Sequence, residues 1–87
     1  MTEVEALKNW VAAQNDAPKL HINGNDHPTA MIVVDFGQPL RGAVMNAERS
    51  AEVSGLLRAA AKSLTRRRGQ IRAQYDNHHG IYWASIS

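Results

Sequence analysis

The sequence contains no cysteine, few aromatic residues and no long apolar segment. Without cysteine no disulfide can stabilise the fold, which fits a reducing compartment. No apolar run approaches the roughly 20 residues that a membrane-spanning helix needs. The first five residues are acidic and lack the apolar segment of a secretory signal. These absences predict a cytoplasmic protein that does not enter the membrane.

Motifs for catalysis or cofactor binding are also missing. Neither a Gly-x-Ser-x-Gly nucleophile motif nor a glycine-rich phosphate loop occurs. Four histidines are present, but the adjacent His78 and His79 with Asp76 have no third ligand at a fixed spacing, so no metal site is predicted. A chain of 87 residues is small for a pocket that encloses a substrate. We therefore predict a protein that is not an enzyme and has no cofactor.

The charge is distributed unevenly along the chain. Residues 1–57 hold four bases and seven acids, a balance of −3, whereas residues 58–87 hold six bases and one acid, a balance of +5, giving the net charge of +2. Such polarity indicates an acidic partner. The six bases are Arg58, Lys62, Arg66, Arg67, Arg68 and Arg72.

The length predicts one domain, residues 1–87, which begins with a short helix. Thr2 and Glu5 have the spacing of a capping box, in which each side chain satisfies a free backbone donor. Apolar residues then recur three and four positions apart, which predicts a helix over about 3–14. Its inward-facing residues are Val4, Leu7, Trp10 and Val11.

Three strands are expected in the next segment. Residues 19–22 form a short one, and residues 30–36 form the clearest one, because apolar and β-branched residues dominate it. The turn residues 37–39 then lead to residues 40–45. We expect 40–45 to return beside 30–36 as a hairpin.

A long helix is expected over about 47–67. Its apolar stripe consists of Val53, Leu57, Ala60, Ala61 and Leu64. Gly69 is suited to the position that follows a helix end. Gly55, inside the helix, costs about 1 kcal/mol relative to alanine. Either close packing against the sheet or chance accounts for that glycine.

The C-terminal segment predicts a second hairpin, with residues 70–76 and 81–86 as its strands. A four-residue loop pairs Asp76 with Ile81 and brings Tyr75 opposite Tyr82. Ala73 with Ala84 and Ile71 with Ile86 then share the face of the tyrosines. The opposite face carries Arg72, Gln74, Trp83 and Ser85.

Together these elements predict an α+β fold. It consists of an antiparallel sheet of four to five strands, one long helix packed across it and the short N-terminal helix. The order of strand, Gly37-Gln38-Pro39 turn, strand and alanine-rich helix over residues 31–64 resembles a unit of short uncharacterised proteins of actinobacteria and their phages. The resemblance implies a fold unit and a bacterial or phage origin, and it transfers no functional residue.

The basic segment and Trp83 are the predicted partner-binding residues. Arg58, Lys62 and Arg66 recur every four residues and therefore form a stripe on one helix face. The remaining three bases extend this stripe beyond the helix end toward the hairpin. An ordinary solvated helix face would show the same pattern, because cations near a helix C-terminus are stabilised by the helix dipole. Trp83 is either an exposed contact residue or is covered by a second layer such as the N-terminal helix with Trp10.

Three functional hypotheses follow. The leading one is a small module that binds an acidic protein through the basic helix end and the C-terminal hairpin. The resemblance implies that such a protein is a phage-encoded inhibitor or modulator of a host protein. The alternative is a DNA- or RNA-binding protein that uses the same surface. The third is a structural homodimer, joined through strand edges or through the apolar hairpin face.

Overall fold

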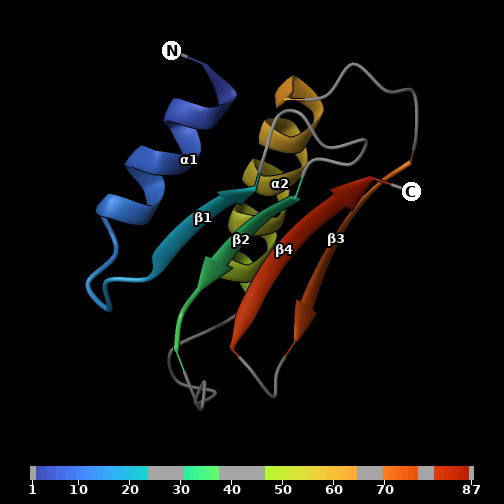
Figure 1. Cartoon of the computed structure of the whole chain (residues 1–87). Helices are drawn as coiled ribbons and strands as arrows, with labels where there is room; N and C mark the ends of the chain where they lie inside the picture. Colours follow the sequence, from blue (N-terminus) through green and yellow to red (C-terminus); the bar gives the residue numbers. More distant parts are fainter. Residues whose placement is uncertain (1, 24–30, 38–46, 65–69, 77–79, 87) are drawn as a thin grey trace.

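The computed structural model describes residues 2–23, 31–37, 47–64, 70–76 and 80–86, and these form one α+β unit. Two helices and a four-stranded antiparallel sheet with the order β1-β2-β4-β3 confirm the predicted fold class (Figure 1). Neither described helix has the length and apolar character needed to span a membrane. The elements are α1 (Glu3–Ala12), β1 (Lys19–Asn23), β2 (Met31–Asp35), α2 (Ala47–Leu64), β3 (Ile71–Asp76) and β4 (Ile81–Ile86).

Helix α1 begins where the capping pattern predicts. The Thr2 hydroxyl accepts a hydrogen bond from the Glu5 backbone N–H at 3.1 Å. The helix ends at Ala12, two residues before the expected end. Leu7 and Val11 are buried, and the other two predicted inward residues, Val4 and Trp10, are half-buried against the same core.

The neighbours of β2 differ from the expected ones. β2 pairs with β1 on one edge, with Val34 opposite Leu20, and with β4 on the other, with Val34 opposite Tyr82. Both edges are therefore occupied, and the predicted hairpin between residues 30–36 and 40–45 is wrong. Residues 40–45 themselves lie outside the described part of the chain. The alternation of side chains predicts a strand correctly, but it does not show which strand lies beside it.

The C-terminal hairpin is confirmed in the predicted register. Asp76 pairs with Ile81, and Tyr75 pairs with Tyr82. The alternation places Tyr82 on the core side, where only 2% of it remains exposed. The sheet therefore turns the tyrosines toward the helices and Trp83 toward the opposite side.

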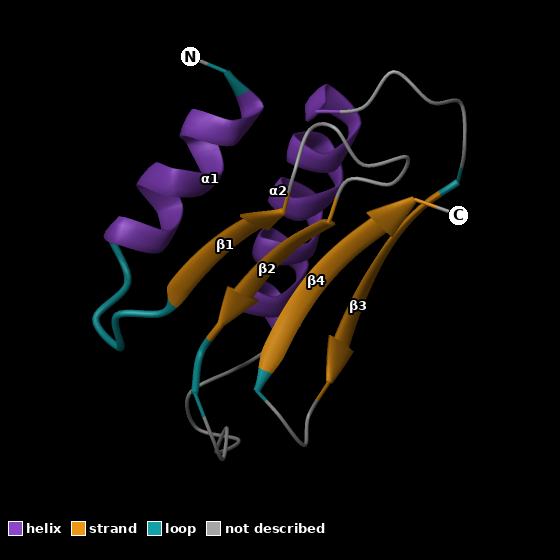
Figure 2. Cartoon of the chain, viewed as in Figure 1, coloured by secondary structure: helices purple, strands orange, loops and turns teal. Residues whose placement is uncertain are grey.

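Helix α2 packs across the sheet through its apolar stripe (Figure 2). Val53, Leu57, Ala60 and Ala61 are buried, as predicted, and Leu64 is half-buried. The expected helical residues 65–67 and the expected capping glycine lie outside the described residues. Gly55 is exposed, and a Cβ built there would meet nothing within 4 Å, so close packing does not explain this glycine.

The hydrophobic core lies between the two helices and one face of the sheet. In the view of Figure 1, α2 crosses behind the sheet and α1 lies at the β1 edge. No described helix covers the face turned toward the viewer. The buried core residues are Leu7, Val11, Ile32, Val34, Val53, Leu57, Ala60, Ala61, Tyr82 and Ala84.

Candidate binding surfaces

The side of the sheet that no described helix covers, called the open face below, is formed by the side chains that alternate with the core residues. Within each strand, successive side chains point to opposite faces. Ile32 and Val34 of β2 and Tyr82 and Ala84 of β4 point into the core, so their neighbours point away from it. The described residues of the open face are Lys19, His21, Val33, Asp35, Arg72, Gln74, Asp76, Ile81, Trp83 and Ser85.

The centre of the open face is apolar. Val33, Ile81 and Trp83 are only half-buried, and none of them packs against the hydrophobic core. They lie on β2 and β4, the two central strands, and Val33 is the register partner of Trp83. Large apolar side chains on a sheet face that lacks a covering layer are typical of a contact surface.

Polar residues surround this apolar centre on the two outer strands. β1 contributes Lys19 and His21, and β3 contributes Arg72, Gln74 and Asp76. Asp35 of β2 and Ser85 of β4 complete the rim. Among the described residues of the open face, two bases, Lys19 and Arg72, accompany two acids, Asp35 and Asp76. The open face therefore has an apolar centre and a polar rim without excess charge.

Trp83 is not covered by α1. The sequence left open whether the N-terminal helix with Trp10 covers Trp83. Trp10 lies on the other side of the sheet, where its ring meets that of Phe36 edge to face with the ring centroids 6.2 Å apart. Phe36 in turn meets Tyr82 edge to face, and Tyr82 stacks on Tyr75 at 4.2 Å. Four of the five aromatic residues thus form a continuous row on the helix side, and Trp83 is the only aromatic residue of the open face.

The two tyrosines of this row form a close apolar contact. Desolvation raises the pKa of Tyr75, and the neighbouring Tyr82 and Asp76 raise it further. The Tyr82 hydroxyl donates a hydrogen bond to Ser50 Oγ at 2.8 Å. This bond ties the sheet to the first turn of α2, and it satisfies a polar group that would otherwise be costly in the core.

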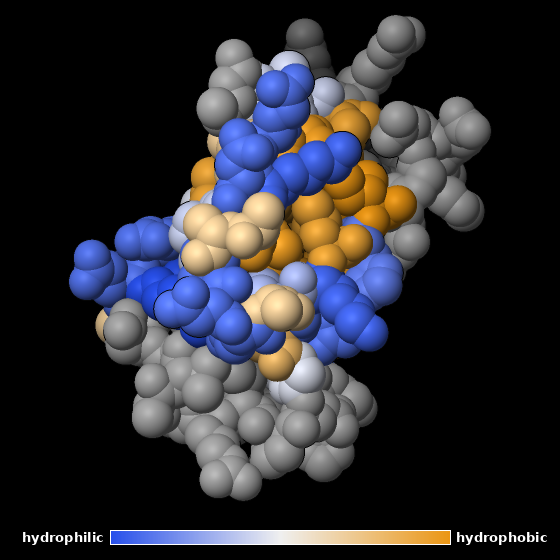
Figure 3. Space-filling view, turned by 90° about the vertical axis from the view of Figure 1, so that its left-hand side faces the viewer, coloured by the Kyte–Doolittle hydropathy of each residue, from blue (hydrophilic) through white to orange (hydrophobic). Residues whose placement is uncertain are grey.

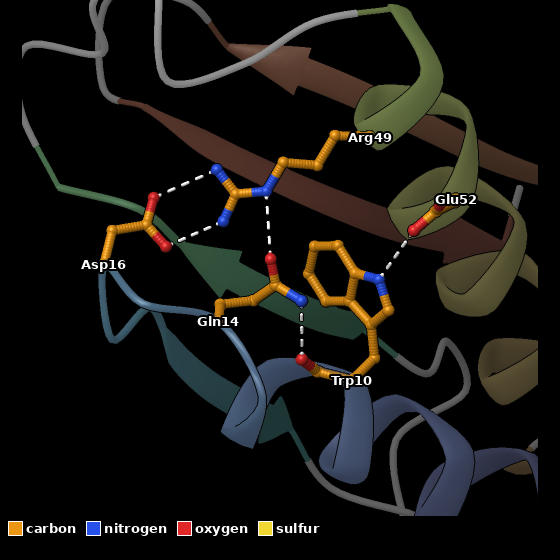
Figure 4. Close-up of polar contacts among 5 residues, drawn as sticks. All are labelled: Trp10, Gln14, Asp16, Arg49 and Glu52. Carbon is orange, nitrogen blue, oxygen red and sulfur yellow. Dashed lines mark hydrogen bonds and ion pairs between the residues drawn. The ribbon is translucent and has the colours of Figure 1, made fainter.

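Arg49, near the start of α2, is the centre of a polar network that sequence reasoning missed (Figure 4). Its guanidinium donates to both carboxylate oxygens of Asp16, at 2.7 and 3.0 Å, and its Nε donates to Gln14 Oε1 at 3.1 Å. The Arg49 Cζ atom also lies 4.8 Å from the Phe36 ring centroid and 5.7 Å from that of Trp10. One side chain of α2 therefore contacts α1, the turn that follows α1 and Phe36, directly after β2.

Two further hydrogen bonds fix Gln14 and Trp10, the residues of this network in and after α1. Gln14 Nε2 donates to the backbone carbonyl of Trp10 at 2.8 Å, and the Trp10 indole N–H donates to Glu52 at 3.0 Å. The hydrogen bond from Arg49 lowers the pKa of Asp16, against the opposing effect of partial burial. Because the Arg49 donors are directed at groups of its own chain, the network is suited to joining α2 to α1 and to the turn that follows α1.

The predicted basic residues do not all lie on one surface. Arg58 and Lys62 are exposed on α2, and they lie on its outer side because the buried stripe of α2 faces the sheet. Arg72 is exposed on the open face, with Trp83, on the opposite side of the molecule. Residues 66–68 lie outside the described residues. Among the described bases, Arg58 and Lys62 therefore lie on one face and Arg72 lies on another.

A further apolar area lies beside α1. Figure 3 shows hydrophobic surface next to the hydrophilic surface on the side of the molecule that carries this helix. Val4 of α1 and Leu20 and Ile22 of β1 are half-buried there. α1 packs more extensively against α2 than against β1, and these side chains remain partly exposed.

Within the described ranges, no group of three histidine or acidic side chains could hold a metal ion. The described histidine, His21, stands alone on the open face of β1. No protein-family model, no curated protein and no solved structure matches the chain. Function is therefore inferred from the surfaces of the fold.

Proposed function

We propose that this chain is a cytoplasmic, non-catalytic interaction module that binds protein through the open face of its sheet. The observation that carries the proposal is the position of Trp83. It stands half-buried at the centre of a sheet face that no described helix covers, beside Val33 and Ile81, and outside the core. Tryptophan is enriched among the residues that dominate protein interfaces, and an apolar centre with a polar rim is the usual form of such interfaces.

Protein suits this face better than nucleic acid. Single-stranded nucleic acid is bound by stacking successive bases on several aromatic side chains, and the open face offers only Trp83 among its described residues. Binding to a phosphate backbone also needs an excess of positive charge. The two bases of the described open face, Lys19 and Arg72, are balanced by two acids, Asp35 and Asp76, so this face has no such excess.

The outer side of α2 offers a second contact surface, suited to an acidic protein partner. Arg58 and Lys62 lie one helical turn apart and are exposed. The resemblance of residues 31–64 to short actinobacterial and actinophage proteins favours a host protein as this partner and the role of an inhibitor or modulator. A salt-dependent contribution to binding is expected from this surface, because exposed charges are screened by added salt.

The test is capture by the immobilised chain from a nuclease-treated bacterial lysate, with the retained proteins identified by mass spectrometry. Trp83→Ala is expected to weaken retention by roughly 30-fold or more, as for a residue that contributes at least about 2 kcal/mol. Lys8→Ala, at an exposed position on α1, is the matched control and should retain protein like the wild type.

A double charge reversal, Arg58→Glu with Lys62→Glu, separates the two surfaces. It should reduce retention of an acidic partner at low salt and leave binding at the open face intact. Retention that is unchanged by Trp83→Ala, or that disappears on nuclease treatment alone, would refute the proposed function.

A further inference from the structure

We infer that the protein bound by the open face is a second copy of this chain, in a dimer whose two-fold axis runs parallel to the strands. The inference rests on the proposed function, because it names the partner of the same surface. Its basis is the arrangement of the open face, in which Val33 comes opposite Trp83 and Lys19 comes opposite Asp76 across the axis.

The sheet register defines two complete rows of described side chains across the open face. One row consists of His21, Val33, Trp83 and Gln74, and the other consists of Lys19, Asp35, Ile81 and Asp76. A two-fold axis parallel to the strands keeps each row level and reverses the order of the strands. It therefore places β1 over the partner's β3 and β2 over the partner's β4.

The Val33–Trp83 part of the apolar centre matches under this operation, whereas Ile81 comes opposite the partner's Asp35. Val33 of each copy comes opposite the partner's Trp83, so a large side chain meets a smaller one on both sides of the axis. Two sheets that pack face to face lie about 10 Å apart, and their inner side chains interdigitate. Pairing a large residue with a smaller one fills that space better than pairing two tryptophans.

The charged rim matches as well. Lys19, on one outer strand, comes opposite the partner's Asp76, on the other, and the pair occurs twice. In the row that contains Val33 and Trp83, His21 comes opposite the partner's Gln74. A two-fold axis perpendicular to the strands would instead keep the order of the strands, so that His21 meets the partner's His21 and Lys19 lies far from the partner's Asp76. The parallel axis is therefore the one that gives Lys19 an opposite charge.

The expected size of the interface indicates a reversible dimer. Strands about 4.8 Å apart that rise about 3.3 Å per residue make a face roughly 20 Å on each side. Two such faces bury on the order of 1,000 Å², at the lower end for specific interfaces. In this dimer the outer sides of both α2 helices, with Arg58 and Lys62, point away from the axis and stay accessible to an acidic partner.

Sedimentation of the full chain over a wide dilution series tests the dimer. The wild type is expected to change from dimer to monomer on dilution, and Trp83→Ala to remain a monomer at every concentration. Lys19→Asp and Asp76→Lys each place like charges opposite one another, so each alone should be monomeric. An equimolar mixture of these two variants restores both ion pairs and should dimerise again.

The recovery in the mixture is the decisive result, because a variant that merely failed to fold would not recover. Lys8→Asp carries the same charge change as Lys19→Asp at a site far from the open face, and it should dimerise like the wild type. A wild type that is monomeric at every concentration overturns the inference, as does a Lys19→Asp variant that dimerises normally. If the chain is monomeric but Trp83→Ala still abolishes capture of a different protein, the dimer fails while the proposed function stands.

Discussion

Arg49 shows how a single residue can organise a small domain. It lies in the half of the chain where acids outnumber bases, and its importance depends on Asp16 and Gln14, more than thirty residues earlier. The turn that presents Asp16 is itself strained, because Ala17 adopts a φ of 49°, a conformation that costs non-glycine residues about 1–2 kcal/mol. The sequence contains each of these residues, but no local spacing connects them.

The Arg49–Asp16 pair predicts a specific dependence of stability on pH. Because the pKa of Asp16 in the folded protein lies below its ordinary value of 3.8, the pair stabilises the fold above that pH. The stabilisation is lost as the pH falls through the lowered pKa. Asp16→Asn should therefore reduce the free energy of unfolding by about 1 kcal/mol at neutral pH, a value that allows for the partial exposure of the pair.

Urea unfolding of the wild type and of Asp16→Asn, measured across the acidic pH range, checks this prediction. The difference between the two proteins should be constant at neutral pH and should shrink below about pH 4. A difference that stays the same down to about pH 2 would show that the lost stability comes from packing rather than from the charge of Asp16.

At the scale of elements, local sequence patterns predicted the described strands correctly, and they predicted the pairing register where the two paired strands are close in sequence. The β3–β4 hairpin follows from a four-residue loop and matching apolar positions, such as Tyr75 opposite Tyr82. The neighbours of β2 were predicted wrongly, because β2 pairs with Tyr82 and its neighbours, almost fifty residues away. Pairing over that separation depends on the placement of α2 between the two strands in the chain.

Gly55 gives a prediction for helix α2. The residue is exposed inside the helix, and an added Cβ would meet no atom within 4 Å. Gly55→Ala should therefore stabilise the protein by up to about 1 kcal/mol, because alanine loses less backbone entropy in a helix. Thermal unfolding of the variant at fixed concentration measures the gain. A loss of stability would mean that the outer side of α2 contacts something that a methyl group obstructs.

At the scale of the whole molecule, one core joins every described element of the fold except the outer strands, whose side chains pack at its margin. Leu7 of α1, Val34 of β2 and Leu57 of α2 are all fully buried in it. A domain of this size has a thin core, so each buried residue accounts for a large share of the stability. The molecule should therefore unfold as one cooperative unit.

Leu7→Ala tests this cooperativity. Removing a fully buried leucine side chain is expected to cost about 2–5 kcal/mol. Far-UV circular dichroism, which reports the helices, and the fluorescence of Trp83, which reports the sheet in a Trp10→Phe background, should both move to lower denaturant concentration by the same amount. Transitions that separate would show that α1 unfolds independently of the sheet.

The sequence by itself determined the α+β class, the start of α1, the buried stripe of α2 and the register of the C-terminal hairpin, because each depends on residues within a few positions of one another. It also identified Trp83 and placed it opposite the tyrosine face. The tertiary structure alone decided that α1 and α2 pack on the same side of the sheet, away from Trp83. The same arrangement separates Arg58 and Lys62 from Arg72. Which face of a sheet is covered depends on how distant elements share one core, and no local pattern contains that information.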